Sequence, residues 1–405
     1  MHSVVLVMDY DPDFIGGAQT AFVQQAHAFL DAGVKVSVII PPGRECAENI
    51  RALGGNVRLL SPTVTIPGLR FPVVRNTAAV RAILRAEFAA AECDAVIVHS
   101  EFGLAAASAA VALERGIPLL QVVHTFFWRA QPTPRFVAAA AERGYHWLTG
   151  VPIPQIELAA NPLSSALRRM TLALALVADG VLSPSAHQAA LLRRAGAQRV
   201  HVVSNAMRHT VVPSVPRDST FGARPLRLVW IGRCSPEKRL EIAVDAVLAL
   251  TRELGPNRVM LDIVGSGPTI ARVLREELDR SSIRAHGHLA WPEAQEVLWQ
   301  ADALVLTSVG FDNQPMVALE AFRLGKPIVV SDPVIAGEFG RAAILAPTID
   351  AVGLCSALHK LVVEPERLRD AAAASASAAE EASPARHVER ISAIVRAFRA
   401  QRAVE

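Results

Sequence analysis

The fold of this chain is constrained most by one stretch, residues 308–332, SVGFDNQPMVALEAFRLGKPIVVSD. It follows a short apolar run, Ala303 to Thr307, which is typical of a buried parallel strand. A loop that carries Asp312 leads into a helix expected from about Pro315 to Leu324. A second apolar run, Ile328 to Val330, then begins. The pattern predicts a strand–loop–helix–strand unit whose loop lies at the carboxyl edge of a parallel sheet, where open α/β folds bind ligands.

Two acidic residues of this stretch, Asp312 and Glu320, are eight positions apart. This spacing lets both carboxylates face the same ligand-binding edge of the sheet. The plainer alternative is a buried helix with one surface acid and one capping acid, and this stretch alone does not exclude it.

The length of the chain predicts two domains. Its 405 residues exceed what a single core usually organises, and hydrophobic residues, 51% of the total, suffice for two cores. The proline-rich segment 213–225 is the expected linker. We therefore expect one domain over residues 1–212, a second over 226–384, and a final amphipathic helix within 385–405.

Charge and cysteine content exclude several classes of protein. A net charge of +3 is too small to indicate a nucleic-acid partner. No apolar run approaches the roughly 20 residues that cross a bilayer, and the N-terminus lacks the features of a signal peptide, so we expect a cytoplasmic protein. The cysteines have neither metal-ligand nor redox spacing, so we expect no metal site from them. They are Cys46, Cys93, Cys234 and Cys355.

The N-terminal half opens with a predicted βαβ unit. Strand Ser3 to Met8 is followed by a loop that contains Gly16 and Gly17, and then by a helix from Ala18 to Leu30. Glycines at this place let backbone amides approach a phosphate or a sugar. A turn that merely needs glycine explains them equally well.

Two polar residues of this half follow predicted strands. His124 comes directly after the strand Leu119 to Val123, and Asn205 follows the strand Val200 to Val203. A histidine immediately past a buried parallel strand lies at the ligand-binding edge, although a packed histidine is the plainer alternative.

The segment from Arg129 to Pro162 interrupts the alternation of strands and helices. It is rich in proline, and the residues around it, 126–147, hold a large share of the aromatic side chains. Three interpretations fit this composition: an acceptor-recognition insert, a flap that lies against a membrane, or an ordinary loop with aromatic packing. The sequence does not choose among them.

The C-terminal half contains a predicted phosphate site. The strand Leu226 to Ile231 ends in GRCSPEK, where Ser235 is the expected N-cap of a helix that runs from Pro236 to about Leu254. A diphosphate needs cations and backbone donors at a helix N-terminus, and Arg233 and Lys238 flank this one. The plainer alternative is an arginine and a lysine at the surface near a helix start. The next strand is followed by the turn Gly265-Ser266-Gly267-Pro268.

These segments together resemble the retaining GT-B glycosyltransferases of family four. GRCSPEKRLEIAVDA is similar to the G-R-x-x-x-x-K-G segment of that family, VGSGP resembles its V-G-x-G-P turn, and the pair Asp312 and Glu320 resembles its E-x7-E signature. The resemblance runs from the first strand to about residue 332 and is most specific over residues 228–332.

The resemblance implies an α/β fold of two Rossmann-like domains that face a central cleft, with the last helix returning to the first domain. It also implies a UDP- or GDP-sugar as donor substrate, no separate cofactor and no metal. Arg233 and Lys238 would bind the diphosphate and Glu320 the ribose, while His124 and Asp312 would orient the sugar. Further donor contacts are implied for Gly16, Gly17, Asn205, Gly265, Gly267, Met316 and Val317.

Three features of the sequence depart from the family pattern. Asp312 stands where glutamate is usual, which shortens its reach by roughly 1 Å. Asn313-Gln314-Pro315 replaces a frequent G-F-G, and Pro315 removes one backbone donor. Arg239 replaces the glycine that usually follows the lysine.

The expected activity is therefore retaining, metal-independent transfer of a hexose-type sugar to a hydroxyl acceptor. The acceptor would be a cell-envelope glycan, a lipid or a small molecule, and peripheral association with the inner face of the membrane is left open. Two alternatives stand beside it. One is a sugar-nucleotide-binding regulatory protein that has lost catalysis, and the other is a different GT-B enzyme, either a phosphorylase or a nucleotide-sugar epimerase.

Overall fold

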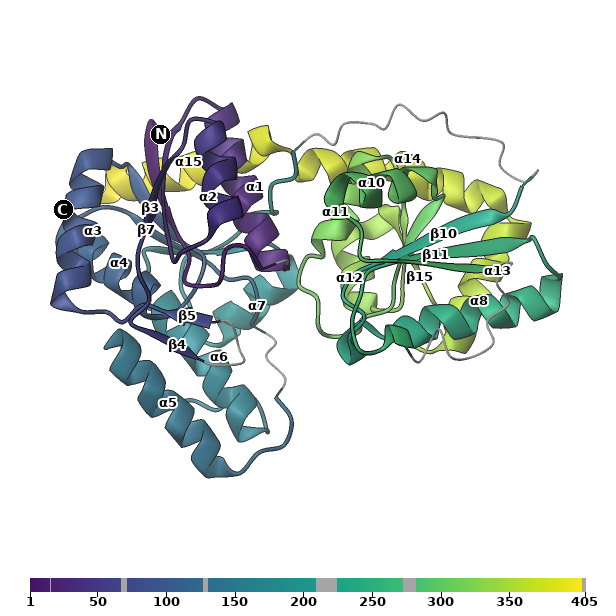
Figure 1. Ribbon diagram of the computed structural model, residues 1–405, viewed down its shortest axis with the longest axis horizontal. Helices are drawn as coiled ribbons and strands as arrows, with labels where there is room; N and C mark the ends of the chain where they lie inside the picture. Colours follow the sequence, from purple (N-terminus) through teal and green to yellow (C-terminus); the bar gives the residue numbers. More distant parts are fainter. Residues whose placement is uncertain (15, 67–70, 127–129, 209–223, 272–281, 403–405) are drawn as a thin grey trace. The chain divides into compact units, whose positions relative to one another are not determined.

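The computed structural model forms two compact units (Figure 1). The first unit comprises Met1–Arg208 together with Ala382–Glu405, and the second comprises His209–Glu381. The predicted linker, residues 213–225, lies outside the described residues except for its last two. The structure describes residues 1–405 except 15, 67–70, 127–129, 209–223, 272–281 and 403–405.

The first unit is built on a seven-stranded parallel sheet in the order β3-β2-β1-β6-β7-β8-β9. Its strands are almost continuously apolar because helices cover both faces of the sheet. This is a doubly wound arrangement, in which the strand order reverses between β1 and β6. The strands are β1 (Ser3–Val7), β2 (Lys35–Ile40), β3 (Asn56–Leu59), β6 (Ala95–Val98), β7 (Leu119–Val122), β8 (Gly180–Ser183) and β9 (Val200–Val202), with a separate hairpin of β4 (Val64–Ile66) and β5 (Phe71–Val73).

Alternate residues of each strand pack against different helices, as the two-residue period of a strand requires. Val4 and Leu6 of β1 lie in the core with α1, α2 and α15, whereas Val5 and Val7 lie in the core with α3 and α4. The helices of this unit are α1 (Gly17–Asp31), α2 (Arg44–Ala52), α3 (Ala78–Ala91), α4 (Gly103–Glu114), α5 (Arg135–Thr149), α6 (Pro162–Ala175), α7 (Ala186–Arg194) and α15 (Pro384–Arg402).

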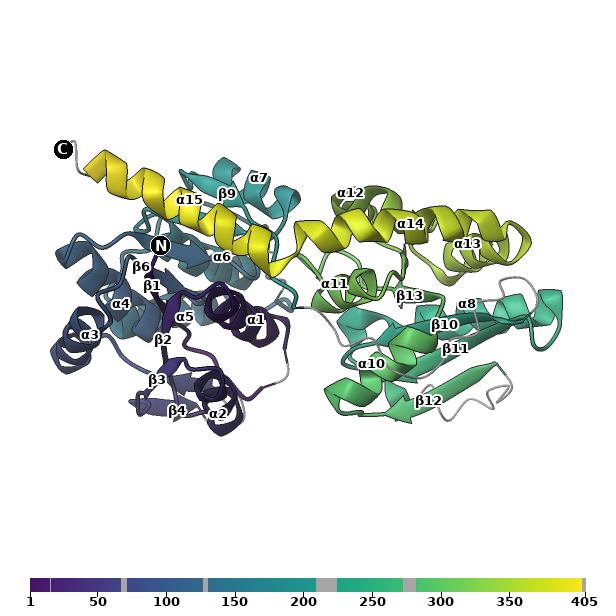
Figure 2. The same cartoon turned by 90° about the horizontal axis from the view of Figure 1, so that it is seen from above.

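The last helix, α15, is part of the first unit although the chain reaches it from the second. It contacts α1, and Figure 2 shows the two helices running close together. Four apolar residues at helical spacing on this amphipathic helix are buried in the core of the unit. They are Val388, Ile391, Val395 and Phe398.

The second unit repeats the arrangement with a six-stranded parallel sheet in the order β12-β11-β10-β13-β14-β15. Helices α8 and α13 pack on one face with Leu228 and Trp230, while α10, α11 and α12 contact β10, β13 and β14. The strands are β10 (Leu226–Ile231), β11 (Val259–Val264), β12 (Ile283–Gly287), β13 (Ala303–Leu306), β14 (Ile328–Val330) and β15 (Ala343–Leu345). The helices are η1 (Pro236–Lys238), α8 (Leu240–Leu254), α10 (Trp291–Gln300), α11 (Met316–Arg323), α12 (Pro333–Phe339), η2 (Gly340–Ala342), α13 (Ala351–Val363) and α14 (Pro365–Glu381).

One prediction about secondary structure is wrong, and one segment that the sequence left open contains a helix. The helix expected from Pro236 to Leu254 is interrupted, because a single 3₁₀ turn ends at Lys238 and Arg239 adopts the left-handed conformation before α8 begins. The proline-rich segment from Arg129 to Pro162 is not simply a loop, since its prolines flank a fifteen-residue helix, α5. Residues 127–129 lie outside the described part.

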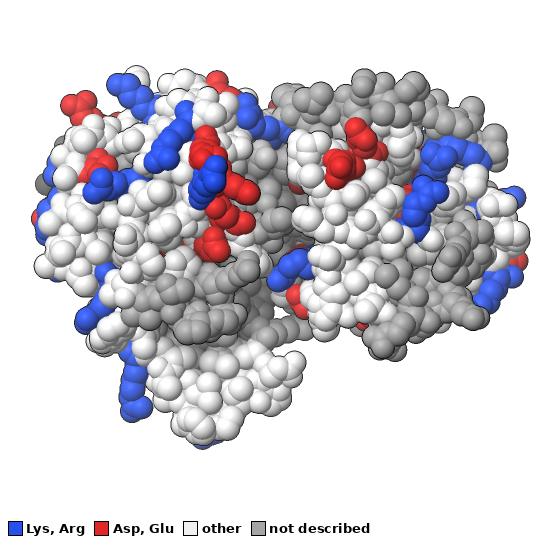
Figure 3. Space-filling model, in the orientation of Figure 1, with Lys and Arg blue, Asp and Glu red and all other residues white. Residues whose placement is uncertain are grey.

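The described helices include none that is long and apolar enough to cross a bilayer. On the face of the molecule drawn in Figure 3, acidic and basic side chains are interspersed over the first unit. Among the described residues of the first unit on this face, the basic side chains therefore form no continuous field of the kind that attracts nucleic acid.

Candidate functional site

The second unit offers a ligand-binding edge where its strand order reverses. Because β10 pairs with both β11 and β13, the loops that follow β10 and β13 leave the sheet side by side. These loops are residues 232–239 and 307–315, and they carry Arg233, Lys238 and Asp312. Ligands of open α/β sheets bind at such a reversal, outside the carboxyl ends of the strands.

An ion pair joins the two loops. Lys238 Nζ donates a hydrogen bond of 2.6 Å to Asp312 Oδ1, and the Ser308 hydroxyl donates to the other carboxylate oxygen. The Lys238 carbonyl accepts from Thr307 Oγ1 at 2.7 Å, which ties the loops together a second time. The structure thus brings together a cation predicted to bind diphosphate and a carboxylate predicted to orient a sugar, although 74 positions separate them.

Arg233 lies on the same loop but outside this ion pair. Its side chain is about half exposed and lies 3.4 Å from Glu237 Oε1. The Ser235 hydroxyl also donates to Glu237, at 2.6 Å. Ser235 is the N-cap of the 3₁₀ turn, at the predicted position, but its side chain makes no capping hydrogen bond.

Arg239 occupies a conformation that favours glycine. Its φ is 51° and its ψ is 44°, in the left-handed region. The guanidinium donates to the carbonyl of Ile349 at 2.8 Å and lies 3.5 Å from that of Thr307. These tertiary contacts hold an arginine where the family pattern has glycine, and they explain why a helix signal beginning at Pro236 stops after one turn.

Gly265 and Gly267 are required by close packing of the neighbouring loops. A Cβ at Gly265 would lie 1.9 Å from the Gly232 carbonyl oxygen, and one at Gly267 would lie 2.4 Å from the Cys234 carbonyl oxygen. Both also have positive φ, 140° and 148°. The two glycines therefore let the turn after β11 support the loop that carries Arg233 and Lys238.

Glu320 is a buried carboxylate on α11. Only 9% of the residue is exposed, and Gln295 Nε2 donates to Glu320 Oε2 at 2.8 Å. Removal from water outweighs this hydrogen bond and raises the pKa of Glu320 to about 7. Its partners differ from those of Asp312, so the two acids of the sequence signature make separate contacts. Met316 and Val317 form the first turn of α11, where Met316 is buried and Val317 half-buried.

The predicted glycines of the first unit lie at the start of α1. Gly16 is the N-cap and Gly17 the first helical residue. A Cβ at Gly16 would lie 2.7 Å from Gln19 Oε1, whereas a Cβ at Gly17 would meet no atom within 4 Å. The close atom at position 16 is the end of a flexible side chain that can move aside, so packing among the described residues does not require glycine at either position.

His124 follows β7 and belongs to a chain of buried polar groups. Its Nε2 lies 2.9 Å from His99 Nδ1, and His99 Nε2 lies 2.7 Å from Gln25 Oε1. Burial lowers the pKa of His124 to about 4. The imidazole is therefore neutral at pH 7 and serves as a hydrogen-bonding group rather than as a cation.

Asn205 lies just past β9 and is 8% exposed. Its carbonyl accepts a long hydrogen bond of 3.4 Å from the Ser204 hydroxyl. The carbonyl of Ser204 in turn accepts from His387 Nδ1 on α15 at 2.7 Å. Asn205 is thus held beside the point where α15 joins the first unit.

Sequence analysis missed two buried acids, Asp9 and Glu101, which follow β1 and β6 at the strand reversal of the first unit. Asp9 accepts from Ser100 Oγ and from two amides at the start of α4, and burial still raises its pKa to about 6. Glu101 accepts from Tyr10 at 3.1 Å and from Thr171 at 3.3 Å, and burial raises its pKa to about 7. Their position directly after the two central strands is the signal that could have found them.

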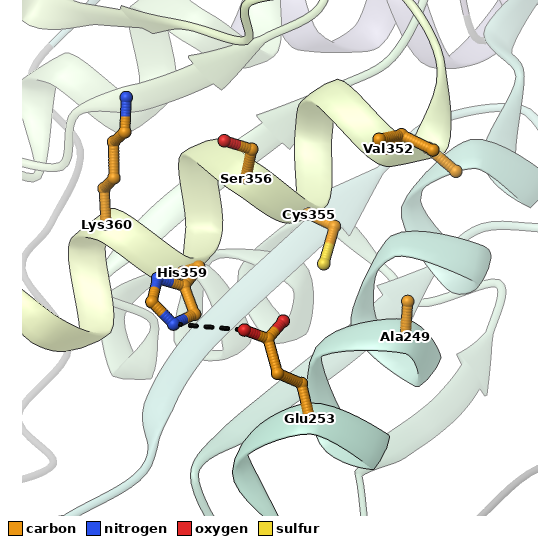
Figure 4. A pocket seen from close by; sticks show the side chains of 8 residues that line it. Ala249, Glu253, Val352, Cys355, Ser356, His359 and Lys360 are labelled. Carbon is orange, nitrogen blue, oxygen red and sulfur yellow. Dashed lines mark ion pairs between the residues drawn. The ribbon is translucent and has the colours of Figure 1, made fainter.

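A hollow between α8 and α13 contains none of the predicted residues. Its volume is about 430 Å³, and Figure 4 shows His359 facing Glu253 across it at 3.3 Å. Its lining is mostly apolar and comes from two helices that pack together on one face of the sheet. The hollow is a groove between packed helices, remote in sequence from the loops at the strand reversal.

Among the described residues, no group of three or more His, Cys, Asp or Glu side chains is arranged to hold a metal ion. The charged side chains on the loops at the strand reversal of the second unit include Arg233, Lys238 and Asp312.

Comparison with protein families now assigns both halves of the chain. The sequence model of "Glycosyltransferase Family 4" matches residues 15–210, and that of "Glycosyl transferases group 1" matches residues 225–364. The chain is made of two glycosyltransferase domains with the GT-B fold. No curated protein sequence matches this GT-B chain.

Solved structures agree with the assignment of the GT-B fold. HepE from Anabaena, in complex with UDP and glucose, is 16% identical, with a TM-score of 0.69 over 98% of this chain and 100% of HepE. The pneumococcal O-GlcNAc transferase GtfA, in complex with UDP and GlcNAc, is 14% identical, with a TM-score of 0.67 over 98% and 99%. Sucrose-phosphate synthase from Thermosynechococcus elongatus is 16% identical, with a TM-score of 0.65 over 99% and 100%. The prediction of two Rossmann-like domains in a GT-B fold is thereby confirmed.

Proposed function

We propose that this protein transfers a hexose-type sugar from a UDP- or GDP-sugar to a hydroxyl group, with retention of anomeric configuration and without a metal ion. The observation that carries the proposal is the ion pair between Lys238 and Asp312, which joins the two loops at the strand reversal of the second unit. A cation and a carboxylate at that edge suit a ligand with an anionic diphosphate beside a sugar rich in hydroxyl groups.

Each residue then has a role that its chemistry supports. The incoming diphosphate binds Lys238 and Arg233. It replaces Asp312 as the partner of Lys238 and Glu237 as the partner of Arg233. Asp312, released from the lysine, accepts hydrogen bonds from sugar hydroxyls. Glu320 accepts from the ribose hydroxyls, and Met316, Val317, Gly265 and Gly267 shape the nucleotide site around it. In the first unit, Gly16, Gly17, His124 and Asn205 contact the donor from the acceptor side.

The reaction breaks the bond between the anomeric carbon and the diphosphate oxygen, and both electrons leave with the nucleoside diphosphate. A new bond forms between that carbon and the acceptor oxygen, and the hydroxyl proton is released, so the products are the glycoside, the nucleoside diphosphate and one proton. Negative charge grows on the leaving diphosphate, so Lys238 and Arg233 stabilise the transition state more than the bound donor. No step in this scheme requires a metal ion or a separate cofactor.

The proposal divides the work between domains with boundaries at 1–212 and 226–384, joined by a linker at 213–225. The second domain binds the nucleotide sugar, and the first receives the acceptor, which is a cell-envelope glycan, a lipid or a small molecule. HepE and GtfA were both solved with UDP and a sugar, which supports UDP as the nucleotide. The proposed location is the cytoplasm, with peripheral association at the inner face of the membrane.

The decisive experiment measures release of nucleoside diphosphate from a panel of UDP- and GDP-hexoses, with candidate acceptors present. We expect one donor to be turned over by the wild type, and Lys238→Ala to lower turnover by about 100-fold, because an electrostatic contact to developing charge is lost. Lys360→Ala, which removes an exposed lysine of the same unit, is the matched control and should change turnover less than twofold.

A second candidate is a nucleotide-sugar-binding regulatory protein without turnover. It is favoured by the short side chain of Asp312, which both Lys238 and Ser308 already engage. A wild type that binds a nucleotide but releases none from any sugar donor would replace the transferase proposal with this one. Dependence on inorganic phosphate, or epimerised product without an acceptor, would instead identify a phosphorylase or an epimerase.

A further inference from the structure

Four polar side chains of the first unit form a continuous hydrogen-bonded chain that ends at His124. His387 on α15 bonds to Gln25 on α1 at 2.8 Å, Gln25 bonds to His99 at 2.7 Å, and His99 bonds to His124 at 2.9 Å. The first three members are almost completely buried, with exposed fractions of 4% for His387, 2% for Gln25 and 1% for His99. The chain thus links the last helix of the protein to a residue proposed to contact the donor sugar.

All three imidazoles of this chain are neutral. Burial lowers the pKa of His387 to about 4 and that of His124 to about 4, and it lowers the pKa of His99 well below its usual range. A neutral imidazole carries one N–H, so each ring donates from one nitrogen and accepts at the other.

The direction of every hydrogen bond follows from the carbonyl at the far end. The carbonyl of Ser204 can only accept, so His387 donates from Nδ1 and accepts at Nε2. Gln25 must therefore donate its amide to His387 and accept from His99 Nε2. His99 then accepts at Nδ1, and only His124 Nε2 can supply that proton.

We propose that Gln25, His99 and His387 are positioning residues that hold His124 as its Nε2–H tautomer, so that the ring accepts a hydrogen bond from a sugar hydroxyl at Nδ1. The ring would then bind a sugar group that donates a hydrogen bond, such as a hydroxyl. It would not bind a group that can only accept a hydrogen bond. This inference rests on the proposed function for the identity of the ligand, but the tautomer itself does not depend on any ligand.

The sequence does not reveal these hydrogen bonds, because two of the four residues occupy positions that usually hold apolar residues. Gln25 lies on the buried face of α1 with Phe22 and Phe29, and His387 lies beside Val388 on the buried face of α15. A polar side chain at a core position is costly to bury without partners, and here each one is satisfied by the next.

The test uses the full-length protein labelled with ¹⁵N-histidine, in which NMR distinguishes a protonated from an unprotonated ring nitrogen. The His124 signals are assigned with His124→Gln. We expect Nε2 of His124 to be protonated in the wild type, and Gln25→Met to replace this single tautomer with a mixture, because a side chain of similar size then neither donates nor accepts. His387→Phe, which acts from the other end of the chain beside Phe29, should do the same. Gln24→Met is the matched control on the same helix and should leave the tautomer unchanged.

A kinetic measurement tests this hydrogen-bonded relay of His387, Gln25, His99 and His124 separately from the proposed activity. Gln25→Met should lower kcat by about tenfold, the value of one hydrogen bond, while the affinity for UDP stays within twofold because the nucleotide binds the second unit. A wild-type His124 protonated at Nδ1, or a tautomer unchanged in both Gln25→Met and His387→Phe, would overturn the relay whether or not the protein is a transferase. Absence of turnover with the expected tautomer change would refute the proposed function and leave the relay standing.

Discussion

Glu320 is the residue on which the account of nucleotide binding depends most, and its environment gives it an unusual titration. It lies on α11, almost fully buried, with Gln295 as a hydrogen-bond donor. Burial raises its pKa from 4.5 to about 7, so the carboxyl keeps its proton in the folded protein at pH values where the unfolded chain has lost it.

This shift makes stability depend on pH in a defined direction. Between pH 4.5 and 7 the folded state binds more protons than the unfolded state, so the contribution of Glu320 to stability is largest below pH 4.5 and falls as pH rises to about 7. We expect Glu320→Gln to remove this fall. The free energy of unfolding of Glu320→Gln minus that of the wild type should increase by roughly 3 kcal/mol between pH 4.5 and pH 7. Above pH 7 this difference should stay constant.

Urea unfolding of both proteins at several pH values measures this difference. Glu296→Gln on α10, where the glutamate is exposed, is the control for a change of charge in the same unit. Parallel profiles for the wild type and Glu320→Gln would show that the carboxyl is not buried as described.

Individual site residues could be predicted from the sequence, but the contacts between them could not. It identified Lys238 and Asp312 separately, from a strand end and from an acidic spacing, but their ion pair joins positions 74 apart and follows only from the pairing of β10 with β13. Gln25 and His387 were missed for the same reason, since their partners lie on other elements.

Among the elements, we propose α5 as the part of the first unit that would contact a membrane. Phe136 and Trp147 are 72% and 51% exposed, and with Ala140 and Arg143 they recur at helical spacing on one outer face. Arg75 lies over the Trp147 ring at 4.3 Å. In Figure 3, the part of the first unit that α5 forms shows basic but no acidic side chains on this face. Aromatic and arginine side chains together suit an anionic lipid surface.

We therefore expect the protein to sediment with vesicles that contain phosphatidylserine and only weakly with vesicles of phosphatidylcholine alone. Phe136→Ser should reduce the bound fraction several-fold, because a large apolar group no longer enters the lipid interface. The matched control is Val352→Ser on the second unit, because Val352 is also an exposed apolar residue, with 77% of its surface accessible. Equal binding by wild type and Phe136→Ser would exclude α5 as the contact.

The elements that sequence analysis predicted well are the central strands, because both faces of each sheet are covered and the strands read as short apolar runs. It missed α5 because flanking prolines obscured a helix of ordinary length. It placed the start of α8 too early because the left-handed conformation of Arg239 depends on the distant carbonyl of Ile349. Local sequence does not contain that contact.

At the scale of the whole molecule, the chain builds two similar α/β units and returns to the first with α15. The fold could be predicted because the strand–helix alternation, two specific motifs and their order along the chain all favour the same architecture. The central proposal that accompanies this fold is functional: we propose that the second unit binds a nucleoside diphosphate at the strand reversal, with Glu320 on the ribose.

The most direct test is thermal stabilisation by UDP, GDP and ADP of the wild type, Glu320→Ala and the control Glu296→Ala. A nucleotide present at 100 times its dissociation constant should raise the free energy of unfolding of the wild type and of the control by about 2.7 kcal/mol. It should not raise that of Glu320→Ala. Equal stabilisation of all three proteins would contradict the role of Glu320. Failure of every nucleotide to stabilise the wild type would contradict the donor site itself and leave only the fold.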